Sequence, residues 1–171
     1  MAVPRNGTRP TSDRVREALF SAVESAVDLD GTRVLDLYAG SGALGLEALS
    51  RGAGEAVFVE SAPGALAVLR ANVTALGLPG VVRAGRVAAV LAAGADAPFG
   101  LVLADPPYAV EDLSGELGLL VSSGWVARES VVIVGRSRRA AGLDWPAPLE
   151  PMRVKHYGET SLHWAWWPGR A

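Results

Sequence analysis

The sequence predicts an α/β fold with a doubly wound, mostly parallel sheet, on three observations. Short, continuously apolar strands alternate with helices along most of the chain, a pattern typical of βαβ units whose sheet is covered on both faces. A glycine-rich turn that starts at Gly40 follows the first strand and opens a helix. The tail differs, because residues 153–166 predict two strands around Gly158 that close the sheet edge as an antiparallel hairpin.

The elements follow from local patterns. The first helix is capped by Ser12 and carries one apolar stripe, Val15, Leu19, Val23 and Val27. Glycine or proline bounds several of the later segments. Further helices are predicted at 43–51, 61–76, 87–93 and 111–122, and strands at 33–37, 56–60, 81–83, 101–105 and 131–134. With the two strands of the tail, the sheet would have seven.

Composition narrows the classes of function. A chain of 171 residues suits a single domain spanning residues 1–171, and half of its residues are hydrophobic. The chain has no cysteine, which excludes disulfides and thiolate metal sites and fits a cytoplasmic protein; no bound metal is expected. The beginning of the chain has no signal-peptide core, and no apolar run is long enough to span a membrane. A cytoplasmic protein without membrane partners is predicted.

The basic residues are clustered. The net charge is −2, so a nucleic-acid binder that works by its overall field is not predicted. Arginines nevertheless gather in two places, and arginine forks suit phosphate; a solvated surface is the alternative interpretation. The first group is Arg5, Arg9, Arg14 and Arg16, and the second is Arg136, Arg138 and Arg139.

The glycine turn and its neighbours indicate a nucleoside-bearing cofactor. Gly40, Gly42 and Gly45 form G-x-G-x-x-G, and Glu60 lies twenty residues after Gly40 at the end of the next strand, where an acid can bind ribose hydroxyls. Asp36 precedes the turn in the pattern D-x-x-x-G-x-G. A carboxylate there would repel a pyrophosphate but can hold a cationic amino-acid group, which favours S-adenosyl-L-methionine. The alternatives are a tight turn without ligand and, for Asp36, a turn-capping carboxylate.

A second motif ends the apolar strand at 101–105. Asp105, Pro106, Pro107 and Tyr108 read D-P-P-Y. Two consecutive prolines end the strand and stiffen the segment after it, so a carboxylate, a free carbonyl and an aromatic face would be held in fixed relation. The alternative is an ordinary strand terminus with a tight turn.

Together these motifs resemble a known family. The segment D-L-Y-A-G-S-G-A-L-G-L-E-A-L-S-R-G-A, Glu60 and D-P-P-Y resemble class I S-adenosylmethionine-dependent methyltransferases that act on exocyclic amino groups. T-R-P-T-S-D-R-V-R-E-A-L-F (8–20) and K-H-Y-G-E-T-S-L (155–162) are similar to the RsmD family, which methylates the N2 of one guanine in small-subunit (16S) ribosomal RNA. The resemblance implies a Rossmann-like class I methyltransferase fold and a cofactor site formed by Asp36, Tyr38, Gly40, Ser41, Gly42, Glu60, Ser61, Arg86 and Val87.

The resemblance also implies a mechanism and partners. Asp105 and the Pro106 carbonyl would accept hydrogen bonds from the guanine amine, Pro107 would keep them fixed, and Tyr108 would stack on the base. Small-subunit ribosomal RNA, within the assembled 30S subunit, would bind a monomeric enzyme through Arg5, Arg9, Arg14, Arg16, Arg136 and Arg138.

The sequence departs from the family in three places. Members begin with a basic β-hairpin, of which residues 1–11 would be a remnant. Gly85-Arg86 stands where the family often has Gly-Asp at the adenine end, and the strand that commonly ends in an acid ends here in Gly135-Arg136.

Other functions stay open at this point. DNA or RNA adenine N6 and protein glutamine methyltransferases share D-P-P-Y, and a nicotinamide-dependent oxidoreductase shares the glycine spacing. A non-catalytic RNA-binding module with a vestigial cofactor pocket is a further alternative, which the intact Asp36, Glu60 and Asp105 disfavour.

Overall fold

The computed structural model describes residues 13–107, 109–110 and 112–169. Its helices are α1 (Asp13–Ala26), α2 (Ala43–Ser50), α3 (Pro63–Leu76), α4 (Val87–Ala92) and α5 (Ser114–Ser122). Its strands are β1 (Arg33–Leu37), β2 (Glu55–Glu60), β3 (Gly80–Ala84), β4 (Leu101–Ala104), β5 (Val131–Ser137), β6 (Glu150–Tyr157) and β7 (Thr160–Trp166). The order of strands and helices confirms the prediction, with differences mainly at element ends.

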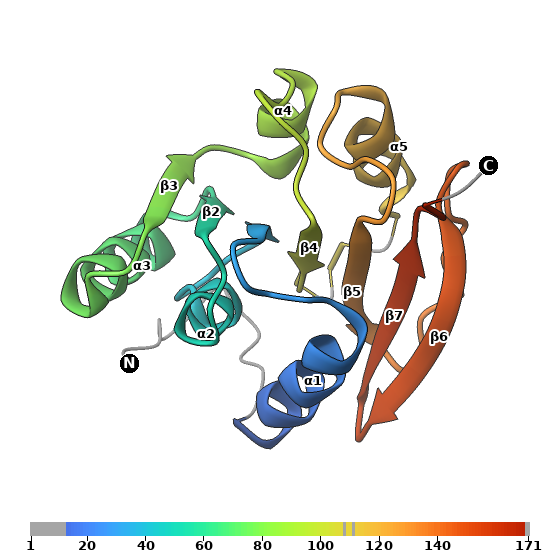
Figure 1. Ribbon diagram of the computed structural model, residues 1–171, viewed down its shortest axis with the longest axis horizontal. Helices are drawn as coiled ribbons and strands as arrows, with labels where there is room; N and C mark the ends of the chain where they lie inside the picture. The colour runs from blue at the N-terminus through green and yellow to red at the C-terminus, as the bar shows by residue number, and fades with distance from the viewer. Residues whose placement is uncertain (1–12, 108, 111, 170–171) are drawn as a thin grey trace.

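The strands form one seven-stranded sheet in the order β3-β2-β1-β4-β5-β7-β6 (Figure 1). The pairs from β3 to β5 are parallel, whereas β7 runs antiparallel to both β5 and β6. The order reverses between β1 and β4, and open α/β sheets bind their ligands beyond the carboxyl ends of the strands at such a reversal. This confirms the doubly wound sheet with a C-terminal antiparallel hairpin. A ligand site is therefore expected beyond the carboxyl ends of β1 and β4.

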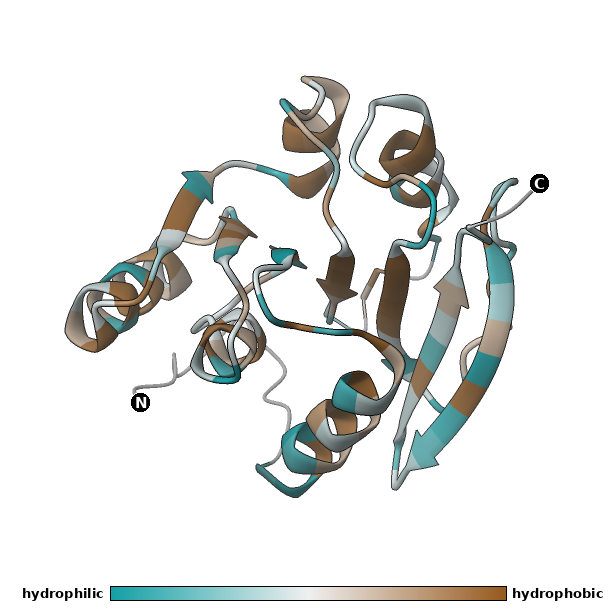
Figure 2. Ribbon diagram, in the orientation of Figure 1, coloured by the Kyte–Doolittle hydropathy of each residue, from teal (hydrophilic) through white to brown (hydrophobic). Residues whose placement is uncertain are grey.

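Helices cover both faces of the sheet and create two apolar layers (Figure 1). On one face α1, α2 and α3 pack through residues such as Phe20, Leu46 and Leu69. On the other, α4 and α5 pack through residues such as Leu91 and Leu117. The central strands β4 and β5 are apolar along most of their length (Figure 2), as expected for strands buried on both faces.

Two elements differ from their predicted bounds for identifiable reasons. α5 begins at Ser114 rather than at residue 111, because Asp112 accepts hydrogen bonds from the backbone N–H and the hydroxyl of Ser114 and so holds a turn before the helix. β5 continues past Val134 to Ser137 because β7 pairs with it over that whole length.

The third glycine of the turn is required by packing. A Cβ at Gly45 would lie 2.4 Å from Cε1 of Phe58 and 3.1 Å from Oδ2 of Asp36, so only glycine lets α2 approach β2 this closely. We expect Gly45→Ala to lower the free energy of unfolding by about 1–3 kcal/mol, the range for an overpacked core.

Urea unfolding followed by circular dichroism measures this change. Gly118→Ala is the matched control, because it also lies within a helix and has no atom within 4 Å of the added Cβ; helix propensity alone should make that variant more stable, by about 1 kcal/mol. A gain in stability by Gly45→Ala equal to that of Gly118→Ala would show that Phe58 moves aside at no cost.

Within the described part of the chain, no helix combines the length and the apolar character needed to cross a membrane.

Candidate active site

The turn between β1 and α2 is built from residues with positive φ. Tyr38, Gly40 and Gly42 have φ values of 56°, 59° and 88°. Such a conformation is costly for tyrosine, and a Cβ at Gly42 would lie 2.6 Å from Cδ1 of Leu69. The glycines therefore let the chain reverse tightly at the end of β1 and bring its backbone close to α3.

Asp36 lies beneath this turn. Its side chain is fully buried, and Oδ2 accepts a hydrogen bond of 2.9 Å from the backbone N–H of Gly45. Burial raises the pKa of Asp36 well above its usual range; the Gly45 hydrogen bond opposes the rise, and the charges of Asp105 and Glu60 add to it. The alternative role of Asp36, a turn-capping carboxylate, is thus present. The repulsion between Asp36 and the other two carboxylates is one that a bound cation would relieve.

Glu60, at the end of β2, ties two segments of the site together. Its Oε1 accepts from the N–H of Gly40 at 2.8 Å, and its Oε2 accepts from the N–H groups of Ser61 and Ala62 at 3.0 and 2.9 Å. The carboxylate thus fixes the glycine turn against the start of α3. Each carboxylate oxygen has two lone pairs, so Oε1 keeps acceptor capacity toward a ligand hydroxyl.

Three acids from three neighbouring strands therefore meet at one edge of the sheet. Asp36 and Glu60 come from β1 and β2, Asp105 follows β4, and the charges of both others raise the pKa of Asp36. A polyanionic group such as a pyrophosphate would be repelled here, whereas an ammonium or sulfonium group would be stabilised. This set of carboxylates fits S-adenosylmethionine and disfavours a dinucleotide.

Two contacts in the site had no clear signal in the sequence. The Tyr38 hydroxyl donates to Oε2 of Glu116 on α5 at 2.8 Å, and burial followed by this contact raises the pKa of Tyr38. Asn72 is buried, and its Nδ2 donates to the carbonyl of Ser41 at 2.9 Å. Asn72 therefore braces the glycine turn from α3.

The other predicted cofactor residues lie along the same edge. Ser61 is exposed just after β2, and Arg86 is exposed immediately before α4. Val87, the first residue of α4, is buried. The ends of β2 and β3 bring these residues to the side of the glycine turn where the nucleoside end of a cofactor is expected.

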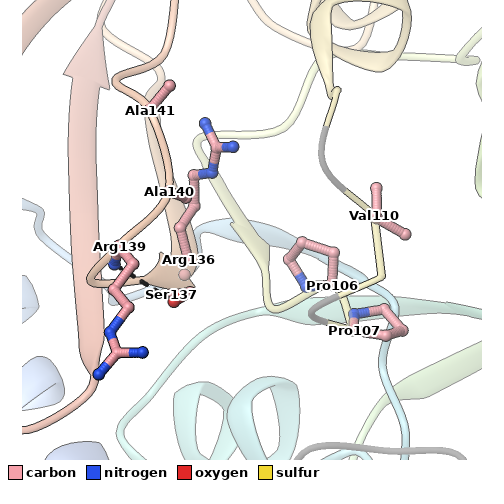
Figure 3. Close-up of a pocket in the computed structure, with 9 residues that line it drawn as sticks. Pro106, Pro107, Val110, Arg136, Ser137, Arg139, Ala140 and Ala141 are labelled. Atoms are coloured by element: carbon pink, nitrogen blue, oxygen red, sulfur yellow. Dashed lines mark hydrogen bonds between the residues drawn. The ribbon is translucent and has the colours of Figure 1, made fainter.

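The D-P-P-Y segment borders a pocket and a narrow recess next to it. Pro106 and Pro107 follow Asp105 beyond the end of β4 and line a pocket of about 430 Å³, whose opposite wall includes Gly135 and Arg136 (Figure 3). Asp105 lines a narrow adjoining recess that shares Gly135 with the pocket. Tyr108 lies outside the described residues. The pocket is of the size that small-ligand sites have, roughly 300–1,000 Å³.

The predicted RNA-binding arginines differ in solvent exposure and in ion pairing. Arg14 and Arg138 are exposed, and Arg136 is nearly buried in the pocket wall. Arg16 forms ion pairs with Asp13 and Glu47 at 2.7 and 3.5 Å, which place its guanidinium between α1 and α2. Arg5 and Arg9 lie outside the described residues.

The two histidines lie in the strands of the C-terminal hairpin, His156 in β6 and His163 in β7. Among the residues that the structure describes, no three His, Asp or Glu side chains are arranged to hold a metal ion, the three acids at the sheet edge included.

Comparison with known proteins identifies the family. The model of the family described as Conserved hypothetical protein 95 matches residues 1–166. YlbH of Bacillus subtilis (strain 168) is 32% identical over 165 residues, covering 94% of this chain and 89% of the relative. Ribosomal RNA small subunit methyltransferase D of Escherichia coli (strain K12) is 38% identical over 130 residues, covering 75% of this chain and 64% of the relative. The chain belongs to the RsmD family of methyltransferases.

Solved structures agree with this assignment. The structure of yhhF from Escherichia coli superposes with a TM-score of 0.86 at 32% identity, over 99% of this chain and 92% of that one. A protein from Thermus thermophilus gives a TM-score of 0.75 at 33% identity, over 96% and 91% of the two chains. As an RsmD-family methyltransferase, the chain uses S-adenosyl-L-methionine as its cofactor, in agreement with the acids at the sheet edge.

Proposed function

We propose that this protein transfers a methyl group from S-adenosylmethionine to the exocyclic N2 of a guanine in small-subunit ribosomal RNA. The observation that carries the proposal is the Asp105-Pro106-Pro107 segment, in which Asp105 belongs to the acid cluster at the sheet edge and the prolines line a base-sized pocket. The name of the Escherichia coli relative, a ribosomal RNA small subunit methyltransferase, supports the substrate class. The electrostatics disfavour a nicotinamide-dependent oxidoreductase, since a pyrophosphate would face buried carboxylates.

The residues of this chain would act mainly by orientation. The bound cofactor supplies a methyl group on a positively charged sulfur. Asp36 and Glu60 would hold its cationic and ribose ends, and the glycine turn would let the backbone approach it. The aromatic face of Tyr108 would receive the extruded base.

The amine of guanine is a poor nucleophile because its lone pair is delocalised into the ring. Asp105 and the Pro106 carbonyl would accept its two N–H groups and direct the lone pair at the methyl carbon. A bound S-adenosylmethionine would supply the methyl group and leave as neutral S-adenosylhomocysteine, and Asp105 would accept the proton that the amine loses. No metal is needed for this displacement.

RNA would be held by local sets of arginines, because a net charge of −2 gives no attractive overall field. The exposed Arg14 and Arg138 suit phosphate contacts, as do Arg5 and Arg9 if they share that surface. The paired Arg16 would contribute less. We expect a monomeric, cytoplasmic enzyme that acts on the assembled 30S subunit.

Mass mapping of methylated nucleosides in ribosomal RNA, from cells with and without the gene, tests the proposal. We expect one N2-methylguanosine of the small subunit to disappear without the gene and to return with the wild-type protein. Loss of an N6-methyladenosine instead would overturn the guanine assignment in favour of the adenine alternative. Unchanged ribosomal RNA would overturn the substrate class.

A further inference from the structure

The pocket beside the D-P-P-Y segment has two chemically different walls. One wall is Pro106, Pro107 and Val110; the other is the end of β5 and the segment after it, with Gly135, Arg136 and Ser137 (Figure 3). The side chain of Arg136 extends along the pocket from the β5 wall, opposite Pro106 and Val110, whereas that of Arg139 points the other way (Figure 3). A cation and an apolar surface therefore face the same space.

Arg136 differs from the other arginines near the site in its burial. It is 8% exposed, while Arg138 and Arg139 are exposed on the surface next to it. Arg136 lies in β5 opposite Ser161 of β7, so the strand pairing fixes its backbone. The hydrogen bonds from Ser114 chiefly lower the pKa of Asp112, on the segment after the prolines, and the charge of Arg136 adds to that lowering. A base inserted into the pocket would meet Arg136, whereas a phosphate backbone outside the pocket would meet the exposed Arg138.

We propose that Arg136 selects guanine by donating its forked N–H groups to the O6 and N7 acceptors of the base, an inference that rests on the proposed function. A guanine whose N2 amine lies at Asp105 and the Pro106 carbonyl directs O6 and N7 away from them, toward the β5 wall. Arginine bound to O6 and N7 is the commonest specific contact with guanine. An adenine whose N6 amine took the same place would present no carbonyl to Arg136, so Arg136 would separate guanine N2 from adenine N6 methylation.

A base analogue isolates this contact. 2,6-Diaminopurine keeps the N2 amine and N7 of guanine but replaces the O6 acceptor with an amine, which a guanidinium would oppose, and the N1–H donor with an acceptor. The change at N1 is the same for every variant, so the part of the preference that depends on Arg136 reports the O6 contact. Small subunits would be reconstituted from ribosomal RNA that carries guanosine or 2,6-diaminopurine riboside at the guanine mapped above. Single-turnover methyl transfer to each would then be measured with wild type, Arg136→Gln, Arg136→Lys and the control Arg139→Gln.

We expect wild type and Arg139→Gln to methylate the guanosine substrate faster than the 2,6-diaminopurine substrate. The forked contact should account for about 5- to 150-fold of this rate ratio. Arg136→Gln should lose that part, and Arg136→Lys, which keeps the buried charge without the fork, should retain only some of it. Affinity for S-adenosylmethionine and the circular dichroism spectrum, expected to match wild type, verify that both variants are folded.

Three results would overturn the inference. Equal slowing of both substrates by Arg136→Gln would place Arg136 on the RNA backbone instead. Full retention of the preference in Arg136→Lys would show that charge alone suffices and exclude the forked contact. Failure of the wild type to produce N2-methylguanosine in the mapping experiment would overturn the proposed function itself, and the base contact with it.

Discussion

Asp105→Ala is expected to abolish methyl transfer while leaving affinity for S-adenosylmethionine within a few-fold of wild type. Asp105 lies just beyond β4, next to the prolines and the recess at Gly135, where it would hold the target amine. Misplacing a reacting group by about 1 Å can cost about 100-fold in rate, so losing one of two acceptors should cost at least that much. Its charge also raises the pKa of Asp36, which explains why a small change in cofactor affinity is allowed.

Single-turnover assays with tritiated cofactor and small subunits from unmethylated cells measure the rate, and calorimetry measures the affinity. Asp112→Ala is the matched control, because Asp112 is an exposed carboxylate of the same loop that hydrogen-bonds Ser114; it should keep nearly full activity. Transfer by Asp105→Ala within a few-fold of wild type would remove Asp105 from the mechanism.

Asp36→Asn is expected to weaken cofactor binding and to stabilise the protein without cofactor. Loss of a charge-assisted contact costs about 1.5–3 kcal/mol of binding free energy. The gain in stability follows from the raised pKa of Asp36, whose largest cause is burial. Between the unfolded pKa, roughly 3.9, and the higher folded value, the native state holds a proton that the unfolded state has released, so stability falls as pH rises through this window.

Asparagine does not ionise, so Asp36→Asn does not lose stability in this pH window. The variant should therefore exceed the wild type in stability most at a pH above the folded-state pKa of Asp36, and the difference should vanish near the unfolded-state pKa. About 1 kcal/mol corresponds to roughly 2–4 °C in the melting temperature of a domain of this size. Thermal melts across a pH series, with and without S-adenosylhomocysteine, measure both effects. Asp30→Asn, which changes an exposed carboxylate before β1, should alter neither; a destabilised Asp36→Asn with normal cofactor affinity would contradict the assignment.

The two predictions separate binding from chemistry within one cluster of acids. Asp36 is fully buried and hydrogen-bonded to the backbone of α2, so we expect its charge to act on the cofactor rather than on the substrate. Asp105 is only half-buried beside the pocket, so its oxygens can reach a substrate. The same residue type thus has different roles because its surroundings differ.

The architecture, and the edge of the sheet at which the site lies, could be predicted from local patterns in the sequence. Alternating apolar strands and helices predicted a parallel sheet, and the glycine turn, Glu60 and D-P-P-Y each follow a strand, so parallel pairing had to bring them to the same edge. These signals are local in the chain and could be read residue by residue.

The contacts between segments that are distant in the chain could not be predicted, because they depend on the tertiary fold. Tyr38 meets Glu116, 78 residues away, and Asn72 reaches Ser41; nothing near either residue in the sequence encodes its partner. β7 pairs with β5 as far as Ser137, which makes Arg136 part of a strand and a wall of the pocket. Arg16, an ordinary basic residue in the sequence, is paired because folding brings Glu47 to it. Local pattern sets what a segment can form, whereas burial and partners depend on which segments the fold brings together.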